Sequence, residues 1–455
     1  MDFLLVAILL AWSFASNFIP LSEKRLRSLM VANAVLTSLA LLALAIPAIA
    51  GNSTSIFENL FTVDQLRGLI IVPVAISWIS GVVAFSLWWG ASFKSGTGTR
   101  PLFCLRSYTL VGAFAGIVLM LLTNSLPLVL LGLLLTFFMA CVGVLFQVTD
   151  SVLHHVRMFA LGLGGALIAL AGGVTLLLFA GYYVTGTLLL TGDAVRAAEM
   201  GTVGPLAMLG ITLTGFAGMW FMGLLPGMTW YRKGIASLPN GQRLMMRVFL
   251  PAALFPHFLT LSAWGGASGE LFVQKMLLLF GLFAGITLVE YLRVQEGVSD
   301  SLVVLLLAMA LVSMGYGPAG AIPALMMIMM LVFVGTLFLL AHGGVWLKPD
   351  VRKYAVAVVA GVPFVSPLFV PYALSVGYGI QMMPLVACIS SAILVYATYT
   401  LSCRVFRAWS EAEPKYSDVW GARVAAVLLV GMTVYGCWFM YADALSLMVD
   451  AVGGV

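Results

Sequence analysis

The chain has 455 residues, of which 62% are hydrophobic and 9% are charged, and its formal net charge at pH 7 is +5. An average soluble protein has about 25% charged residues, so this composition excludes a water-soluble globular protein. The loops between apolar segments account for the small positive charge, which therefore requires no nucleic-acid partner.

Apolar segments close to the ~20 residues that cross a bilayer recur along the whole chain, and no segment between them is long or polar enough for a soluble domain. The sequence therefore predicts an all-α polytopic membrane protein with one integral membrane domain, residues 1–455. The fourteen predicted spans are about 2–20, 29–51, 69–90, 108–123, 126–148, 158–181, 202–226, 245–265, 272–292, 301–316, 320–341, 354–375, 382–403 and 422–444.

Basic residues lie mostly on one side of this predicted topology. Seventeen lysines and arginines fall in odd-numbered connections, and only Arg67, Arg196 and Lys275 fall in even-numbered ones. Because cytoplasmic loops carry the excess of basic residues, we expect the odd connections in the cytoplasm and both termini on the outer, periplasmic side of a bacterial inner membrane. The first span lacks a basic n-region and a small-residue cleavage site, so we interpret it as a retained helix.

The third span is preceded by a polar outer connection that ends at Asp64. An Asp directly before an apolar span is typical of a helix N-cap. We therefore predict that Asp64 caps the third helix.

No catalytic pattern is found along the chain. The five cysteines and four histidines show no metal-ligand or disulfide spacing, and neither a Gly-rich phosphate loop nor a nucleophile elbow occurs. We expect no catalytic centre, metal or cofactor within this chain.

Residues 202–265 contain an apolar span, a short basic turn and a second apolar span that carries Arg247 four residues before Pro251. Proline has no N–H, so it leaves the carbonyl four residues earlier, that of Arg247, without its helical partner. A cation beside a loosened turn is what an ion path through a bilayer would use. The alternative is that Arg247 only snorkels to the inner surface.

Three further residues are candidates for an ion path. His257 lies ten residues after Arg247, or ~15 Å along a helix, and it could hold a proton near neutral pH or be a hydrogen-bonded core residue. Glu290 and Arg293 are three apart at the inner end of the ninth span, the spacing of an ion pair on one helix face. They are either a plain interfacial pair or a proton-loading site.

Five segments carry a resemblance to a known family. Residues 62–86 look like the third helix of the antiporter-like membrane subunits shared by respiratory complex I, Mrp-type antiporters and membrane-bound hydrogenases. Residues 124–146 and 154–190 resemble the fifth and sixth helices of that family, residues 224–230 (LLPGMTW) its exit from helix seven, and residues 359–375 its helix twelve. The resemblance implies fourteen spans with two inverted five-helix repeats, helices 4–8 and 9–13.

The chain lacks most of the charged residues along which that family passes protons. The resemblance implies a helix-five glutamate and lysines in helices seven, eight, ten and twelve, but these positions fall near Leu134, Gly215 and Pro371, and helix ten has no lysine. Only Arg247 stands near a family lysine, that of helix eight. Arginine cannot release its proton as lysine can, so the resemblance alone does not predict proton pumping.

Prolines interrupt two spans at corresponding places. Pro226 ends the seventh span, and Pro363, Pro367 and Pro371 interrupt the twelfth. In transporters built from inverted repeats, such broken helices mark the central site, although kinks that serve packing only would give the same pattern. We therefore predict repeats over 108–265 and 272–403.

Three functional hypotheses follow. The first is a membrane subunit of a multi-subunit proton- or cation-translocating assembly. The chain would be a degenerate antiporter-like subunit with a scaffold or modified ion-path role, and the complete assembly would be related to NADH/quinone oxidoreductases or hydrogenases. The second is the membrane subunit of a DAB-type inorganic-carbon uptake system, for bicarbonate or CO₂, with a large zinc-containing, carbonic-anhydrase-like cytoplasmic partner. The third is an unrelated secondary transporter. The expected partners are thus other membrane subunits or a large cytoplasmic protein, within a lipid bilayer.

Overall fold

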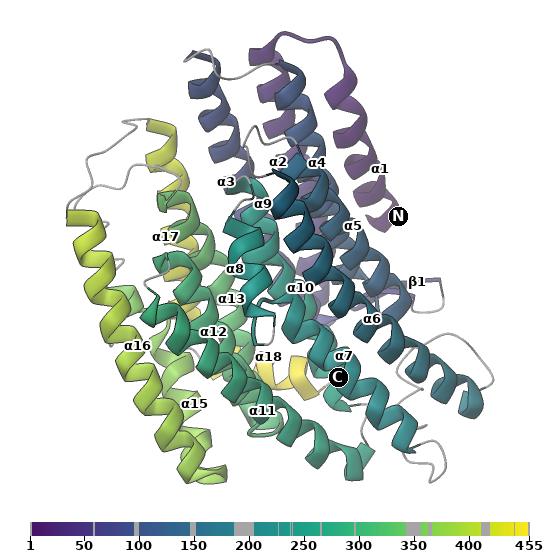
Figure 1. Cartoon of the computed structure of the whole chain (residues 1–455), viewed down its shortest axis with the longest axis vertical. Coiled ribbons are helices and arrows are strands. Elements are labelled where there is room, and N and C mark those ends of the chain that lie inside the picture. The colour runs from purple at the N-terminus through teal and green to yellow at the C-terminus, as the bar shows by residue number, and fades with distance from the viewer. Residues whose placement is uncertain are drawn as a thin grey trace.

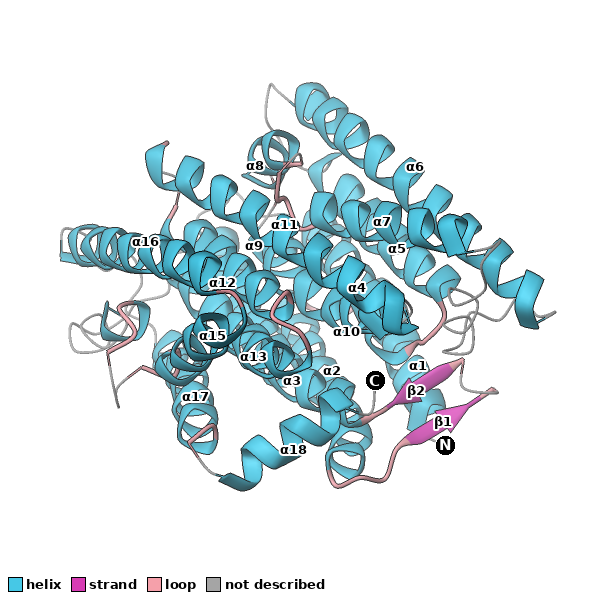
Figure 2. Cartoon of the chain, turned by 90° about the horizontal axis from the view of Figure 1, so that it is seen from below, coloured by secondary structure: helices cyan, strands magenta, loops and turns pink. Residues whose placement is uncertain are grey.

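The structure is a computed structural model. It describes residues 2–453 except for 58–59, 95–99, 146–151, 186–203, 226, 237, 239, 264–265, 295–296, 343–355, 363–365, 411–418 and 441. The described part is almost wholly helical, apart from one two-stranded hairpin (Figures 1 and 2).

The first part of the chain forms an N-terminal group of long helices. These are α1 (Asp2–Ala15), α2 (Glu23–Ile49), α3 (Gln65–Lys94), α4 (Arg100–Leu122), α5 (Leu126–Leu145) and α6 (Val152–Thr185). The antiparallel hairpin of β1 (Thr54–Ile56) and β2 (Phe61–Val63) joins α2 to α3. The hairpin lies within the polar outer connection, where the sequence analysis expects no regular element.

The middle of the chain is more irregular. It comprises α7 (Gly204–Phe221), α8 (Met228–Ala236), α9 (Asn240–Leu244), a π-helical turn (Met245–Phe249) and α10 (Leu250–Ala263). The expected basic turn after the seventh span therefore contains a helix of its own, α8. Its sequence, MTWYRKGIA, alternates apolar and polar residues at helical spacing.

The remaining helices follow in hairpin-like succession. They are α11 (Gly266–Arg293), α12 (Val298–Met314), α13 (Pro318–His342), α15 (Phe369–Met382), α16 (Pro384–Ser410), α17 (Val419–Trp438) and α18 (Ala442–Gly453). Helix α18 is an element that the sequence analysis does not include. The count of fourteen spans stays a prediction, because several connections lie outside the described residues.

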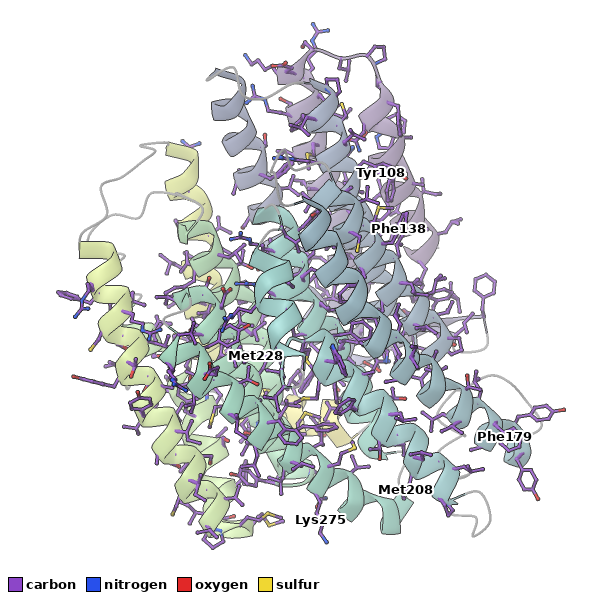
Figure 3. All side chains as sticks on the ribbon, viewed as in Figure 1. Tyr108, Phe138, Phe179, Met208, Met228 and Lys275 are labelled. Carbon is purple, nitrogen blue, oxygen red and sulfur yellow. The ribbon has the colours of Figure 1, made fainter. Side chains whose placement is uncertain are left out.

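The helices confirm an integral membrane protein. Within the described residues, nine helices are long and apolar enough to cross a membrane. In Figure 3, Phe179, Met208 and Lys275 lie toward one end of the molecule, and the turn that joins α1 to α2 lies at the other end (Figure 1).

Helix α13 occupies the centre of the second part of the molecule. An apolar 18-residue stretch of α13 is completely buried, and the helix packs against α3, α10, α12, α15, α17 and α18. Its sequence is apolar on all sides, which is the pattern of a helix enclosed by protein. Helix α13 therefore contributes no Asp, Glu, Lys or Arg side chain to this centre.

The helix cap at Asp64 is confirmed. The Arg67 backbone N–H donates to Asp64 Oδ1 at 2.8 Å, and the Asp64 carboxylate also pairs with the Arg67 guanidinium. The Arg67 side chain is 3% exposed. Asp64 thus both begins α3 and neutralises a buried cation in the first turn of that helix.

Candidate functional site

Arg247 lies in the π-helical turn between α9 and α10. The backbone N–H of Leu250 donates to the Met245 carbonyl, five residues back, directly before Pro251. A π turn adds one residue to the helical repeat, and here it lies where Pro251 disturbs the regular ladder. The helix therefore widens at Arg247 and continues, rather than breaking there.

The Arg247 side chain forms a buried ion pair with Asp300. Asp300 belongs to the first turn of α12, and the side chains of Arg247 and Asp300 are 5% and 13% exposed. The snorkelling alternative for Arg247 is therefore wrong, because the guanidinium is held inside the protein. Asp300 is a site residue that the sequence reasoning above does not include. The signal for it is an acidic residue in the first turn of an apolar span, where the helix dipole favours negative charge.

Tyr231 of α8 completes the surroundings of this ion pair. Its hydroxyl donates to the Met246 carbonyl at 3.1 Å, and its ring centroid lies 5.9 Å from the Arg247 guanidinium carbon. That distance is within the range of a cation–π interaction. Helix α8 thus contacts the π turn through Tyr231, and helix α12 contacts it through Asp300.

His257 lies further along α10 and contacts α4. Its Nε2 is 2.9 Å from the Met120 carbonyl oxygen. A carbonyl can only accept a hydrogen bond, so Nε2 carries the proton and His257 donates. The side chain is buried, as the core-histidine interpretation expects.

A buried arginine, Arg67, lies beside the same end of α4. Arg67 donates to the Thr123 carbonyl at 3.4 Å, three residues beyond Met120. The last carbonyls of a helix lack helical partners and carry partial negative charge. His257 and Arg67 both bind this carbonyl-rich end of α4.

An apolar cavity lies beside α10. It has a volume of about 10 Å³ and is lined by residues such as Met222, Pro251, Phe255 and Leu311. Apolar cavities of this kind stay dry.

Glu290 and Arg293 form the ion pair that their spacing predicts, with 3.9 Å between Glu290 Oε2 and Arg293 NH1. Their side chains are 36% and 82% exposed, whereas Arg247 is buried. The pair thus occupies an exposed face of α11. Glu290 and Arg293 form an ion pair separate from that of Arg247 and Asp300.

The first helix interruption follows α7. Gly223 has a φ of +74°, and the Leu225 N–H donates to the Thr287 hydroxyl of α11 at 2.9 Å. The predicted break residue Pro226 lies outside the described residues. A side chain from a neighbouring helix thus satisfies a backbone donor in the interruption.

The second interruption precedes α15. Gly361 has a φ of +67°, and Ser366 bridges the gap by donating to the Val358 carbonyl at 2.7 Å and accepting from the Leu368 N–H at 3.1 Å. Pro367 is buried beside Ser366. A protein hydroxyl thus satisfies backbone groups here, so these groups need no water.

Of the other two prolines in this interruption, Pro371 is buried in the first turn of α15, and Pro363 lies outside the described residues. A proline in the first turn of a helix removes no helical hydrogen bond. Pro371 therefore starts α15 and does not kink it.

Comparisons with known proteins identify the fold. No family model matches the sequence, and no curated protein matches it. Among solved structures, a chain of respiratory complex I from Thermus thermophilus with bound NADH has a TM-score of 0.76 at 14% identity, covering 100% of this chain and 99% of that one.

Two other complexes contain similar chains. A chain of the Mrp complex from Dietzia sp. has a TM-score of 0.69 at 15% identity and covers 99% of this chain and 96% of that one. A chain of the membrane-bound sulfane sulfur reductase, an archaeal respiratory membrane complex, has a TM-score of 0.75 at 14% identity, covering 96% and 76%. The structure therefore has the antiporter-like fold that the sequence motifs indicate.

Proposed function

We propose that this chain is a membrane subunit of a multi-subunit ion-translocating assembly, in which it holds a structural place and does not relay protons itself. The fold supports the first part, because the similar chains belong to an Mrp complex and to respiratory membrane complexes. The buried Arg247–Asp300 pair supports the second part. Other membrane subunits are the expected partners.

The pair suits a fixed structural role because neither member readily changes charge. Arginine stays protonated in proteins, and a carboxylate in the first turn of a helix is stabilised as an anion by the helix dipole. Asp300 has that position in α12. A relay requires groups that gain and lose protons, and the Arg247–Asp300 pair instead joins the π turn to α12.

The π turn favours a second candidate, a modified ion path at Arg247. Single π-helical turns within α-helices are frequent at functional sites, and Arg247 lies in the middle of Met245–Phe249. In this alternative Arg247 and His257 would lie on one path along α10. The apolar cavity beside α10 is dry and supplies no water to such a path.

One experiment separates the two candidates. The assembly is purified with Arg247→Met, with Asp300→Leu, or with both changes, and ion flux is measured after reconstitution into vesicles. A structural pair predicts that each single change reduces assembly and that the double change restores assembly together with flux. An ion path predicts that the double variant assembles without flux. Glu290→Gln, in the exposed ion pair of α11, is the matched control and leaves both properties unchanged.

We further propose the two inverted repeats, 108–265 and 272–403. The two interruptions support this assignment because each has a glycine with positive φ, Gly223 or Gly361. A tyrosine from the following helix lies beside each glycine, Tyr231 in the first case and Tyr372 in the second. These matched features are what a duplicated element predicts.

The orientation is also a proposal. The basic connections favour odd-numbered loops in the cytoplasm and both termini on the periplasmic side of a bacterial inner membrane. A reporter fused at either terminus and tested for periplasmic activity checks it. The inorganic-carbon alternative with a large cytoplasmic zinc protein receives no support from the fold, and neither does an unrelated transporter.

A further inference from the structure

Helix α16 (Pro384–Ser410) lies at the edge of the molecule (Figures 1 and 2). Of its membrane-spanning stretch, 28% is buried, the smallest share among the nine membrane-length helices in the described residues. Much of that exposed surface is aliphatic, as a lipid-facing helix requires. Two polar groups on it do not fit contact with lipid.

These groups are the hydroxyls of Tyr396 and Tyr399, whose side chains are 58% and 70% exposed. The span of α16 runs from Pro384 to Arg407. At 1.5 Å per residue, Tyr396 lies ~18 Å from Pro384 and ~16 Å from Arg407. Tyr399 lies ~12 Å from Arg407, and helical side chains lean toward the N-terminus, which moves its hydroxyl closer to the middle.

That depth is unusual for an exposed tyrosine. Tyrosines that face a membrane gather at its interfaces, where the hydroxyl reaches water or headgroups. Tyr182 and Tyr183 follow this rule, because they are exposed within three residues of the end of α6 at Thr185. Lipid tails offer no acceptor, and an unsatisfied hydroxyl in hydrocarbon costs free energy.

The residues beside the two tyrosines suit close contact with another helix. Cys388, Ala392 and Cys403 are exposed and follow helical spacing with Tyr396 and Tyr399 along one face of α16. Small residues allow two helix backbones to approach within a membrane, and polar side chains then bond across the contact. This face has both features, and the tyrosines supply the donors.

We propose that this face of α16 binds a transmembrane helix of a neighbouring membrane subunit, which offers hydrogen-bond acceptors to Tyr396 and Tyr399 near the membrane centre. The proposal rests on the proposed function and adds to it the face through which the subunit joins its assembly. The carbonyls beside small residues, or Ser, Thr, Asn and Gln side chains, are suitable acceptors on the partner helix.

The test uses the full chain in its native membrane. The photoreactive residue p-benzoyl-L-phenylalanine replaces Tyr399 in one strain and Ile168, an exposed residue of α6, in another. After irradiation, the proposal expects a covalent adduct between this chain and a different membrane polypeptide at position 399 and not at position 168. An adduct with a second copy of this chain, or with lipid alone, overturns the proposed face.

The proposed function is tested separately by what co-purifies in mild detergent without irradiation. If other membrane subunits co-purify but position 399 yields lipid adducts only, the function stands and the face is wrong. If no other membrane polypeptide co-purifies, the function and the face are both overturned.

A second pair of variants tests the hydroxyls themselves. Tyr396→Phe with Tyr399→Phe is expected to weaken retention of the neighbouring subunit about threefold per hydroxyl, the typical effect of a hydrogen bond between membrane helices. The matched change, Tyr182→Phe with Tyr183→Phe, is expected to leave retention unchanged. Equal retention in both pairs overturns the role of the two hydroxyls.

Discussion

The ring of Tyr231 fills the space directly beside Gly223. A Cβ atom at Gly223 would overlap three atoms of that ring, and the φ of Gly223 is +74°. The ring has little freedom to move, because its hydroxyl bonds to the Met246 carbonyl at 3.1 Å. The end of α7 and the π turn are thus linked through one aromatic side chain.

We predict from this contact that Gly223→Ala destabilises the protein more than Gly361→Ala. Both changes place a side chain at positive φ, which costs roughly 1–2 kcal/mol. At Gly361 the nearest Tyr372 atom is 3.3 Å from the added Cβ, so overpacking, worth about 1–3 kcal/mol, arises mainly at Gly223. Thermal unfolding in detergent measures the difference, and equal melting temperatures would contradict the prediction.

The Asp64–Arg67 contact leads to a prediction that separates a cap from an ion pair. Asn is a good helix N-cap, so Asp64→Asn keeps the bond from the Arg67 N–H and removes only the negative charge. We expect a loss of roughly 1–3 kcal/mol, below the 3–5 kcal/mol of a fully buried broken pair, because Asp64 is 36% exposed. Asp64→Ala should cost about 1 kcal/mol more.

Denaturant unfolding of the two variants provides the measurement. Asp64→Asn combined with Arg67→Met removes both charges and serves as the control, since it leaves no unpaired cation. If this double variant is as unstable as Asp64→Asn alone, the charge pairing contributes nothing.

For Arg247 and Asp300 we predict strong coupling in stability. Removing one member of a buried ion pair leaves an uncompensated charge and typically costs about 3–5 kcal/mol, whereas replacing both with apolar residues is often nearly neutral. Arg247→Met and Asp300→Leu should therefore each destabilise the chain far more than the double variant does. Melting temperatures of all four proteins give the coupling energy, and additive losses would show that the two side chains act independently.

The sequence predicts the membrane class, the antiporter-like fold and the Asp64 cap because each depends on local pattern: apolar length, motif order and an acid before a helix. It identifies Arg247 as unusual, since a charge within an apolar span is visible directly. It does not identify Asp300 as the partner. The two residues are 53 positions apart, and their meeting depends on how α12 packs against the π turn.

The same limit applies to the paired Gly/Tyr contacts and to the surroundings of His257. Proline positions predict that helices seven and twelve are interrupted, but they do not show that Thr287 and Ser366 satisfy the backbone there. Helix α8 was missed because its basic residues suggested a turn, although tertiary packing buries Tyr231 and Ile235 on one side of it. Contacts between distant segments are the part that local pattern cannot supply.

His257 gives the last prediction, because its contacts distinguish a structural histidine from a proton carrier. In the structure its Nε2–H donates to the Met120 carbonyl, and the side chain is buried. Protonation would place a positive charge in a buried site, at the end of α4 to which the Arg67 guanidinium also bonds. We therefore expect that His257→Phe leaves the pH profile of ion flux in the reconstituted assembly unchanged.

The stability of the same variants makes that result interpretable. His257→Phe removes the hydrogen-bond donor that His257 supplies to the Met120 carbonyl and should cost about 1–3 kcal/mol, the penalty of an unsatisfied buried group. His257→Gln retains an N–H donor and should cost less. If His257→Phe instead abolishes a pH dependence near neutrality while the protein stays folded, His257 carries a proton, and the proposal of a non-relaying subunit must be given up in favour of the path along α10.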